Sequence, residues 1–244
     1  MIRLLQTADI PAVFSRQGDW QLFRIQALLR AYGTDYDFCR FYRQEESGGL
    51  LSVLDQGGIL SVSEDAELME WWDYLSVAGL RSLTVTDRAG AFFSKMGCTL
   101  SATGAIFRYG NEAEASGQPI PKASGMTELK AVYGILCDSF EMGAFEPWYC
   151  DISRRLRTET AIQYWLKGEG CAFVTADTDR LFLSAVAVSP NQRGQGVGSR
   201  MLEGILSEHR GKQAAVYSRN PNADRFYKRL GFEEIGRWFE YQIG

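Results

Sequence analysis

The feature that most constrains this chain is a glycine-rich turn between an apolar run and an amphipathic pattern. Residues 183–199 read LSAVAVSPNQRGQGVGS, in which glycine occupies positions 194, 196 and 198. The segment SRMLEGILSEH follows, and its apolar residues recur at the three-and-four spacing of one helix face. The segment therefore predicts a strand that passes through a flexible turn into a helix.

The start of such a helix is a favourable place for an anion. Its first amides have no intrahelical partner, and the helix dipole adds partial positive charge there. Glycines before the helix permit positive φ and let a bulky anion approach without a Cβ in the way. Arg193 adds a charged group directly before Gly194. We expect the loop to bind a diphosphate, and the competing interpretation is a structural turn only.

Two familiar phosphate loops do not match this segment. A Walker loop requires Gly-Lys-Ser/Thr after a four-residue gap, and the loop contains no such triplet. The dinucleotide fingerprint requires a glycine three positions after Gly196, where this chain has Ser199. The kind of ligand must therefore be inferred from the neighbouring segments.

A stretch without apolar periodicity divides the chain of 244 residues. GNEAEASGQPIPKASG is rich in small residues, proline and charge, so we expect a linker at 111–125 between domains 1–110 and 126–244. The second domain is expected to contain helices in TELKAVYGILCDSF and DISRRLRTETAIQYWL, a hairpin in CAFVTADTDRLFLSAVAV, the helix after the glycine loop, a strand in AAVYS, a helix in NADRFYKRL and a strand in GRWFEYQI.

The first domain contains a faint copy of the end of the second. Phe92, Phe93 and Gly97 lie 134 residues before Phe226, Tyr227 and Gly231. A constant offset indicates a repeated unit, although three coincidences can also arise by chance. After its own hairpin-like GLLSVLDQGGILSVS, the first domain continues into EDAELMEWWDYLSVAG without an arginine-and-glycine loop. We expect that it cannot bind the same ligand.

Composition narrows the classes of function. The formal net charge of −4 provides no basic field for nucleic acid or an anionic membrane. The N-terminus shows no signal-peptide pattern and no long apolar span, so we expect a cytoplasmic protein. The five cysteines are scattered and His209 is the only histidine, so we expect buried free thiols and no metal site. His209 is expected at a solvated helix end.

Two segments together resemble the GCN5-related N-acetyltransferase (GNAT) family. The match to motif A of that family comprises Val186, Ala187, Val188, Pro190, Arg193, Gly194, Gly196, Gly198 and Ser199. The match to motif B comprises Asn220, Ala223, Phe226, Tyr227, Leu230, Gly231 and Phe232. The resemblance covers residues 126–244 and implies an α/β (α+β) fold, a mixed, mostly antiparallel sheet flanked by helices. For residues 1–110 it implies at most a degenerate second GNAT-like unit of a tandem.

The resemblance implies acetyl-coenzyme A as co-substrate. Its pyrophosphate is expected on the amides of the glycine loop, and its pantetheine arm is expected to pair with the backbone of the preceding strand. Asn220 either orients the pantetheine or caps the helix that follows. The candidate cofactor residues are Val186, Ala187, Val188, Arg193, Gly194, Gln195, Gly196, Val197, Gly198, Ser199 and Asn220.

Acyl transfer to an amine requires a stabilised oxyanion and a proton for the departing thiolate. A backbone N–H near the end of the strand, that of Val188, is the candidate oxyanion donor. Tyr227 matches the family's general acid, with a core aromatic residue as the competing interpretation. No residue stands out as the general base. The candidate acceptor-binding residues are Glu146, Trp148, Tyr149, Asp151 and Arg154, with Arg155 beside them, although a packed helix corner explains this cluster equally well.

The leading hypothesis is an N-acetyltransferase for the primary amine of a small molecule or peptide. Two alternatives remain open: a non-catalytic acyl-coenzyme A binder, and an aminoacyl transferase of the tandem GNAT type. The acyl group can also be longer than acetyl. Residues 1–110 are expected to complete the sheet, cover the acceptor site or form a homodimer contact.

Overall fold

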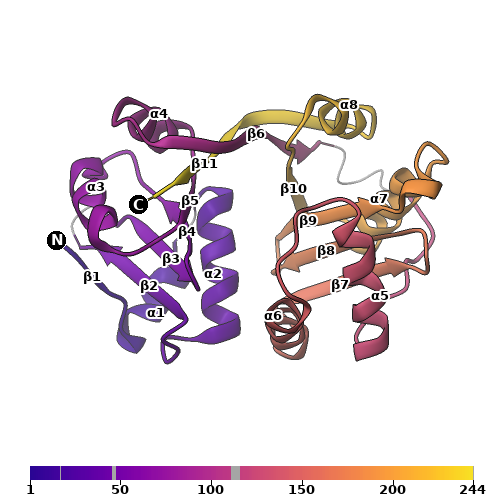
Figure 1. Ribbon diagram of the computed structural model, residues 1–244, viewed down its shortest axis with the longest axis horizontal. Coiled ribbons are helices and arrows are strands. Elements are labelled where there is room, and N and C mark those ends of the chain that lie inside the picture. Colours follow the sequence, from indigo (N-terminus) through magenta and orange to yellow (C-terminus); the bar gives the residue numbers. More distant parts are fainter. Residues whose placement is uncertain (17, 46–47, 111–115, 244) are drawn as a thin grey trace. The chain divides into compact units, whose positions relative to one another are not determined.

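The computed structural model describes residues 1–16, 18–45, 48–110 and 116–243, which form two compact units (Figure 1). Unit 1 comprises Met1–Ile106, Ser218–Asp224 and Glu234–Gly244. Unit 2 comprises Phe107–Tyr217 and Arg225–Glu233. Neither unit is one continuous stretch of chain, because the C-terminal strand pairs with a strand of the first half.

The elements of the first half are β1 (Ile2–Leu4), a 3₁₀ turn (Thr7–Asp9), α1 (Ile10–Phe14), α2 (Trp20–Tyr32), β2 (Cys39–Gln44), β3 (Leu50–Leu54), β4 (Gly57–Ser61), α3 (Leu68–Val77), β5 (Ser82–Thr86), α4 (Asp87–Lys95) and β6 (Thr99–Tyr109). Those of the second half are α5 (Met126–Cys137), α6 (Phe145–Arg157), β7 (Ala161–Leu166), β8 (Gly170–Ala176), β9 (Arg180–Val188), a 3₁₀ turn (Pro190–Gln192), α7 (Val197–Glu208), β10 (Gln213–Tyr217), α8 (Pro221–Arg229) and β11 (Phe232–Gln242).

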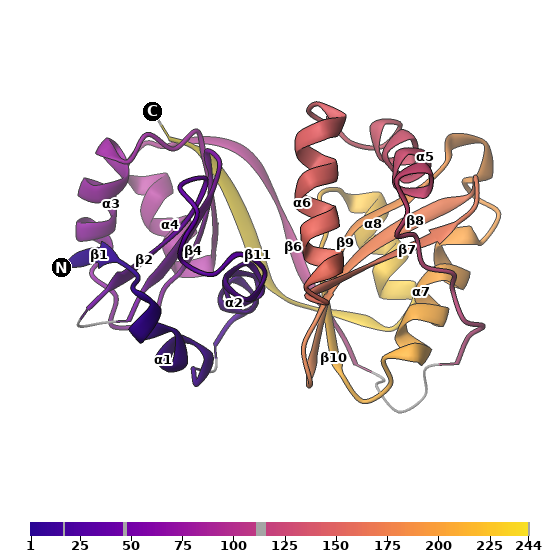
Figure 2. The ribbon, with the colours of Figure 1, turned by 90° about the horizontal axis from the view of Figure 1, so that it is seen from below.

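Backbone hydrogen bonds order the described strands as β1-β2-β3-β4-β5-β11-β6-β10-β9-β8-β7. Most neighbouring strands are antiparallel, and β4 with β5 and β9 with β10 are parallel. The predicted mixed, mostly antiparallel sheet with flanking helices is confirmed. In unit 2, α5 and α6 cover one face of the strands and α7 and α8 cover the other (Figure 2).

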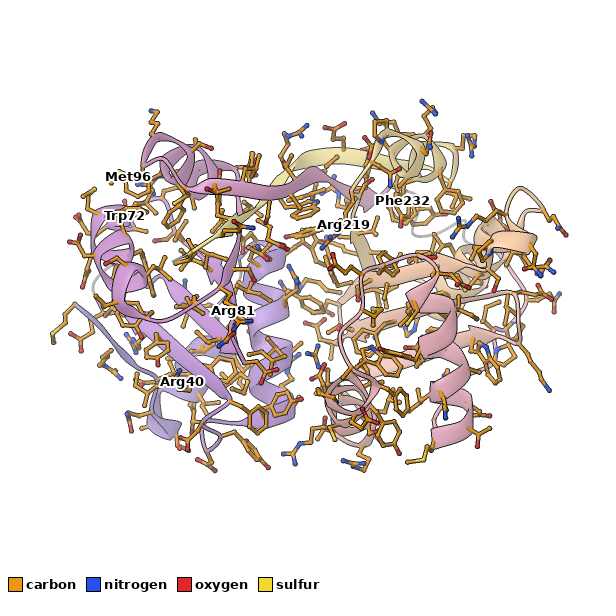
Figure 3. All side chains as sticks on the ribbon, viewed as in Figure 1. Arg40, Trp72, Arg81, Met96, Arg219 and Phe232 are labelled. Carbon is orange, nitrogen blue, oxygen red and sulfur yellow. The ribbon has the colours of Figure 1, made fainter. Side chains whose placement is uncertain are left out.

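Strands β6 and β11 each contribute to both units. The C-terminal part of β11 pairs with β5 from Trp238↔Thr86 to Gln242↔Ser82 inside unit 1. Its first two residues belong to unit 2, where Phe232, labelled in Figure 3, packs on the rings of Tyr109 and Tyr227. Likewise, β6 runs from unit 1 into unit 2 at Phe107. The last strand of the sequence is therefore an inner strand of the unit that begins the sequence.

The predicted linker is only partly described, since residues 111–115 lie outside the described residues. Residues 116–125 belong to unit 2 and pack inside it. Ile120 and Ala123 are buried, the Ala123 amide donates to the Gln163 carbonyl at 2.8 Å, and the Trp165 amide donates to the Pro121 carbonyl at 2.9 Å. This segment therefore covers the outer edge of β7, although its composition predicts an irregular stretch.

One predicted element is wrong. DISRRLRTETAIQYWL was expected to form a single helix, but α6 ends at Arg157 and residues Ala161–Leu166 form β7. The break follows from Glu159, whose φ is +54°, a conformation that interrupts a helix. Two of the thiols expected to be buried, Cys137 and Cys150, are exposed, although all five cysteines are free as predicted.

Candidate active site

The parallel strands β9 and β10 separate part of the way along β9. They pair only from Arg180↔Gln213 to Leu183↔Val216, and β9 continues to Val188. On one side of this stretch, Ser184, Ala187 and Val188 remain paired with β8. Among the described strands, none pairs with the other side of this stretch, so its backbone groups are open to an extended ligand there.

The pairing of this stretch with β8 contains a bulge. Cys171 pairs with Ala187 and Phe173 with Ser184, so β9 contains one more residue than β8 between these two pairs. Ala185 has φ +48°, which is unusual for a residue with a Cβ. A bulge turns the following backbone N–H groups out of the regular ladder. No motif in the sequence indicated this bulge, because it depends on the register with β8.

The glycine loop presents a run of unpaired amides. Gly194 and Gly196 both have φ +78°, and Gly196 is the residue before α7. The first backbone bond into this turn joins the Arg200 amide to the Gly196 carbonyl at 3.0 Å. Within the described chain, the amides of residues 194–199 make no hydrogen bond. A negatively charged group placed there meets several N–H donors and the positive end of α7.

Gly198 has a different role from the other two glycines. A Cβ at Gly198 would lie 3.1 Å from the Phe226 ring, whereas a Cβ at Gly194 or Gly196 would meet nothing within 4 Å. Gly198 therefore permits close packing of α7 on α8. Val197 is buried, Ser199 is half-buried, and the Gln195 side-chain amide donates to the Asn191 carbonyl at 2.9 Å.

The side chain of Arg193 binds protein oxygens. Its Nε donates to the Val188 carbonyl at 3.1 Å, and its Nη2 donates to the Asp138 carbonyl at 3.3 Å and to the Ser139 hydroxyl at 3.2 Å. The sequence did not indicate Asp138 or Ser139, since nothing in their pattern connects them to the loop. Arg193 thus joins the end of β9 to the end of α5.

Tyr227 lies on α8 inside an aromatic cluster. Its ring centroid is 6.0 Å from that of Phe107, 5.2 Å from Phe226 and 5.5 Å from Phe232. The residue is 6% exposed, and its hydroxyl makes no hydrogen bond to any described residue. Burial raises the pKa of Tyr227 far above that of a free tyrosine, so the phenol is protonated at neutral pH.

Asn220 caps α8. Its Oδ1 accepts from the amides of Asn222 at 3.1 Å and Ala223 at 3.0 Å. The capping interpretation is therefore observed, and the side-chain Nδ2 is still available as a donor toward a ligand. Asn220 belongs to unit 1 and the glycine loop to unit 2.

The five candidate acceptor residues all lie on α6, but their environments differ. Trp148 and Tyr149 pack against a core cluster that includes Ala187 of β9, and Ala185 packs against the same cluster. Asp151 forms an ion pair with Arg155 at 2.8 Å. Glu146 is exposed and Arg154 is half-buried. The aromatic part of the cluster is thus connected by packing to the bulged strand.

His209 and the thiols show no arrangement typical of a metal site. His209 lies at the end of α7 as predicted, but its side chain is half-buried and not fully solvated. Its Nε2 lies 2.9 Å from the Tyr164 hydroxyl, and burial lowers the pKa of the imidazole. In the described part of the chain, no three His, Cys, Asp or Glu side chains come together as a metal site. No described helix has the length and apolar character needed to cross a bilayer.

Residues 160–234 match the family model for the acetyltransferase (GNAT) domain. This range contains β9, the glycine loop and Tyr227. Residues 160–234 are therefore a GNAT domain. A 55-residue segment of this chain is 36% identical to peptidyl-lysine N-acetyltransferase YjaB of Salmonella typhimurium, and it covers 22% of the chain but only 38% of that relative.

Solved GNAT structures extend the fold to the whole chain. A GCN5-related N-acetyltransferase from Sphaerobacter thermophilus aligns with a TM-score of 0.64 at 13% identity, over 99% of this chain and 94% of the other. A tandem GNAT protein from the clavulanic acid biosynthesis pathway aligns with a TM-score of 0.59 at 14% identity, over 99% and 97%. The GNAT fold, including a tandem form, therefore accounts for both units.

Proposed function

We propose that this protein transfers an acetyl group from acetyl-coenzyme A to a primary amine, and that unit 2 performs the reaction. The observation that supports this most strongly is the continuity of the open edge of β9 with the unpaired amides of residues 194–199. A strand edge suits a flexible arm that contains amides, and an amide nest at a helix start suits a diphosphate. Coenzyme A combines these two groups in that order.

In this proposal the pantetheine arm pairs with the backbone of Val186–Val188, and the pyrophosphate accepts hydrogen bonds from residues 194–199. The Oδ1 of Asn220 caps α8, and a contact of Asn220 with the pantetheine stays a prediction. Arg193 contributes its positive charge near the loop. This charge is not neutralised by a carboxylate, because all three oxygens that it binds belong to carbonyl or hydroxyl groups.

The reaction forms an amide bond and breaks a thioester. The neutral amine attacks the thioester carbonyl carbon, and the oxyanion accepts a backbone hydrogen bond. The nitrogen then loses a proton to water, the carbon–sulfur bond breaks, and the departing thiolate takes a proton. We expect the oxyanion donor beside the bulge, at the N–H of Val186, in preference to Val188, because the bulge at Ala185 turns this backbone out of the ladder. Tyr227 supplies the proton to sulfur, and its raised pKa keeps it protonated until charge develops there.

The acceptor is proposed to bind beside α6. Trp148 and Tyr149 connect this helix to the core under the bulge, and Glu146 and Arg154 offer charged groups for a small molecule or a peptide. The relative from Salmonella typhimurium carries a name that specifies peptidyl-lysine, which makes a lysine side chain one acceptor to test first. A cytoplasmic setting suits the five free cysteines, and a homodimer is a further prediction that sedimentation can check.

Calorimetry with coenzyme A tests the cofactor site. We expect one molecule of coenzyme A per chain, bound in unit 2. Gly196→Val should bind about tenfold more weakly, because a residue with a Cβ pays roughly 1–2 kcal/mol in the left-handed region and the loop relaxes away from the nest. The matched control is Gly134→Ala in α5, where a Cβ meets nothing within 4 Å and φ is not positive.

Three results would contradict the proposal or redirect it. A stoichiometry of two removes the assignment to unit 2 alone. Unchanged affinity in Gly196→Val removes the amide nest as the pyrophosphate site. Tight binding without release of coenzyme A from acetyl-coenzyme A by any amine, amino acid or lysine peptide favours the non-catalytic binder.

A further inference from the structure

Arg193 connects three segments of unit 2 through one planar group. Its guanidinium binds the Val188 carbonyl at the end of β9, the Asp138 carbonyl directly after α5, and the Ser139 hydroxyl. The residue itself is the start of the glycine loop. The loop, the strand and the turn after α5 are therefore held by a single side chain.

The turn after α5 leads directly to the proposed acceptor residues. Residues 138–144 connect the end of α5 to Phe145, the first residue of α6. Phe140 and Met142 of this turn pack against the same core cluster as Trp148 and Tyr149. The turn and the helix that carries the acceptor residues therefore share one packing surface.

The chemistry of the contacts suits arginine and not lysine. Three separate N–H groups point in fixed directions to three oxygens, and a single ammonium on a flexible stem cannot reproduce that geometry. The cation also lies at the C-terminal end of α5, where the helix dipole favours positive charge. These contacts occupy Nε and Nη2. An arginine that bound a phosphate directly would need part of these N–H groups for the phosphate.

We propose that Arg193 is a positioning residue that couples coenzyme A binding to the order of the turn 138–144. This inference rests on the proposed function, since it assumes that coenzyme A occupies residues 194–199. When the pyrophosphate fixes the loop, Arg193 is fixed with it, and the turn loses less freedom when an acceptor then binds. Coenzyme A binding therefore prepares the acceptor side, and the phosphate is held by the amides of the loop.

Hydrogen exchange of the amides in 138–144, measured with and without coenzyme A, tests the coupling. In the unmodified protein, we expect coenzyme A to slow exchange in this turn. In Arg193→Lys the turn should exchange about fivefold faster without ligand, as expected for the loss of about one hydrogen bond, and coenzyme A should no longer protect it. The affinity for coenzyme A should stay within about threefold, because the charge and the loop amides remain.

Ser139→Ala distinguishes the coupling from a direct contact of Arg193 with phosphate. It removes the hydroxyl that Arg193 binds and leaves Arg193 itself unchanged. It should accelerate exchange in 138–144 in the same direction as Arg193→Lys, by a smaller factor, with unchanged affinity for coenzyme A. Ser207→Ala in α7 is the matched control, because the hydroxyl of this half-buried serine makes no hydrogen bond within the described residues, and it should change neither quantity.

The outcomes distinguish this inference from the proposed function. If Arg193→Gln weakens coenzyme A by about thirtyfold or more and exchange in 138–144 does not change in any Arg193 variant, Arg193 is a phosphate ligand and the coupling is wrong. If the unmodified protein binds no coenzyme A, the proposed function and the coupling both fail. In that case, faster exchange in ligand-free Arg193→Lys would still show that Arg193 holds the turn.

Discussion

In unit 2 the parallel strands β9 and β10 separate after Leu183, and in unit 1 the parallel strands β4 and β5 separate after Ile59. Beyond the separation in unit 2, β9 continues with an open edge. In unit 1, β4 ends two residues later at Ser61, and the Asp19 carboxylate accepts from the hydroxyls of Ser61 at 2.9 Å and Thr86 at 3.2 Å. One unit offers backbone groups at this point, whereas the other connects its two strands through a side chain.

The turns that follow have opposite polarity. In unit 2, the glycine loop presents amides. In unit 1, the turn between β4 and α3 presents carbonyls to the Arg88 guanidinium, which binds those of Ser63 at 2.8 Å, Glu64 and Ala66 at 3.3 Å. Carbonyl oxygens and the acidic side chains of this turn repel a diphosphate. This difference supports the proposal that coenzyme A binds only to unit 2.

The two units nevertheless share a reciprocal aromatic pair. Phe93 of α4 packs on Tyr241 of β11 with centroids 6.1 Å apart, and Tyr227 of α8 packs on Phe107 of β6 with centroids 6.0 Å apart. Each residue of one pair stands 134 positions from its counterpart in the other. The helices α4 and α8 have the same offset at both ends. The position of the proposed acid Tyr227 therefore corresponds to Phe93, which has no hydroxyl.

Together these differences are the ones expected if the two units share a scaffold and only unit 2 has the proposed site. The buried aromatic pairs, which stabilise the sheet and helices, occur in both units. The groups that a cofactor needs, namely an open strand edge, free amides and a phenol, occur in one. Three substitutions can break or sharpen this comparison.

The largest effect is expected at the shared scaffold. Tyr241 is 0% exposed, and its hydroxyl lies 2.6 Å from the Ser94 hydroxyl and 2.8 Å from the Gly90 carbonyl. Tyr241→Ala should lower the free energy of unfolding by about 3–5 kcal/mol, as for other buried aromatic residues, because it leaves a cavity in unit 1. Urea unfolding measures this loss.

Two variants control this prediction. Tyr241→Phe keeps the ring and loses its hydrogen bonds, so it should cost about 1–2 kcal/mol. Phe107→Ala makes the reciprocal cavity in unit 2, and should weaken coenzyme A binding, whereas Tyr241→Ala should leave the affinity of the folded protein unchanged. If Tyr241→Ala and Phe107→Ala changed the affinity for coenzyme A equally, the proposal that only unit 2 contains the binding site would be wrong.

The second effect concerns the phenol that unit 1 lacks. Tyr227→Phe makes unit 2 resemble unit 1 at this position and should lower kcat by about 10²-fold, or about 2.7 kcal/mol in activation free energy, with little change in coenzyme A affinity. Release of the coenzyme A thiol measures the rate. Tyr109→Phe is the matched control, since Tyr109 packs on the same Phe232 ring.

The pH dependence gives an independent check of Tyr227. Since burial raises its pKa above the ordinary value of about 10, the phenol stays protonated as pH rises from 7 to 9, and kcat should not fall there through loss of this proton. Because the pKa of Tyr227 is higher in the folded than in the unfolded protein, Tyr227 lowers the free energy of unfolding only when the pH exceeds its unfolded pKa of about 10. A rate unchanged in Tyr227→Phe would remove the acid role.

Much of this architecture was predictable from local patterns. The glycine loop, the helix after it, the hairpin in 170–188 and the closing strand all follow from periodicity and turn residues over short distances. The offset of 134 residues found at Phe92, Phe93 and Gly97 is also the offset between α4 and α8. Local patterns failed at β7, where TAIQYWL suits a helix and a strand equally and the register with β8 decides.

The remaining features depend on contacts between residues far apart in the chain. The bulge at Ala185 requires the register with Cys171 and Phe173, and the contact of Arg193 with Asp138 requires two segments that are distant in sequence to meet. The pairing of β11 with β5 joins residues more than half the chain apart. Strand pairing at such separations leaves no periodic signal in the sequence. Neither the pairing of β11 with β5 nor the contacts of Asp19 could therefore be predicted.

The smallest effect is expected at Asp19, whose carboxylate connects β4 and β5 where these strands separate. Besides Ser61 and Thr86, its carboxylate accepts from the Leu22 amide at 2.8 Å as the N-cap of α2. Asp19→Ala should lower the free energy of unfolding by about 1 kcal/mol, as for loss of a helix cap, whereas Asp19→Asn keeps the cap acceptor and should cost less. Both variants should still bind one coenzyme A per chain, because the carbonyls around Arg88 remain. A second molecule bound by Asp19→Ala in calorimetry would show that this carboxylate alone excludes coenzyme A from unit 1.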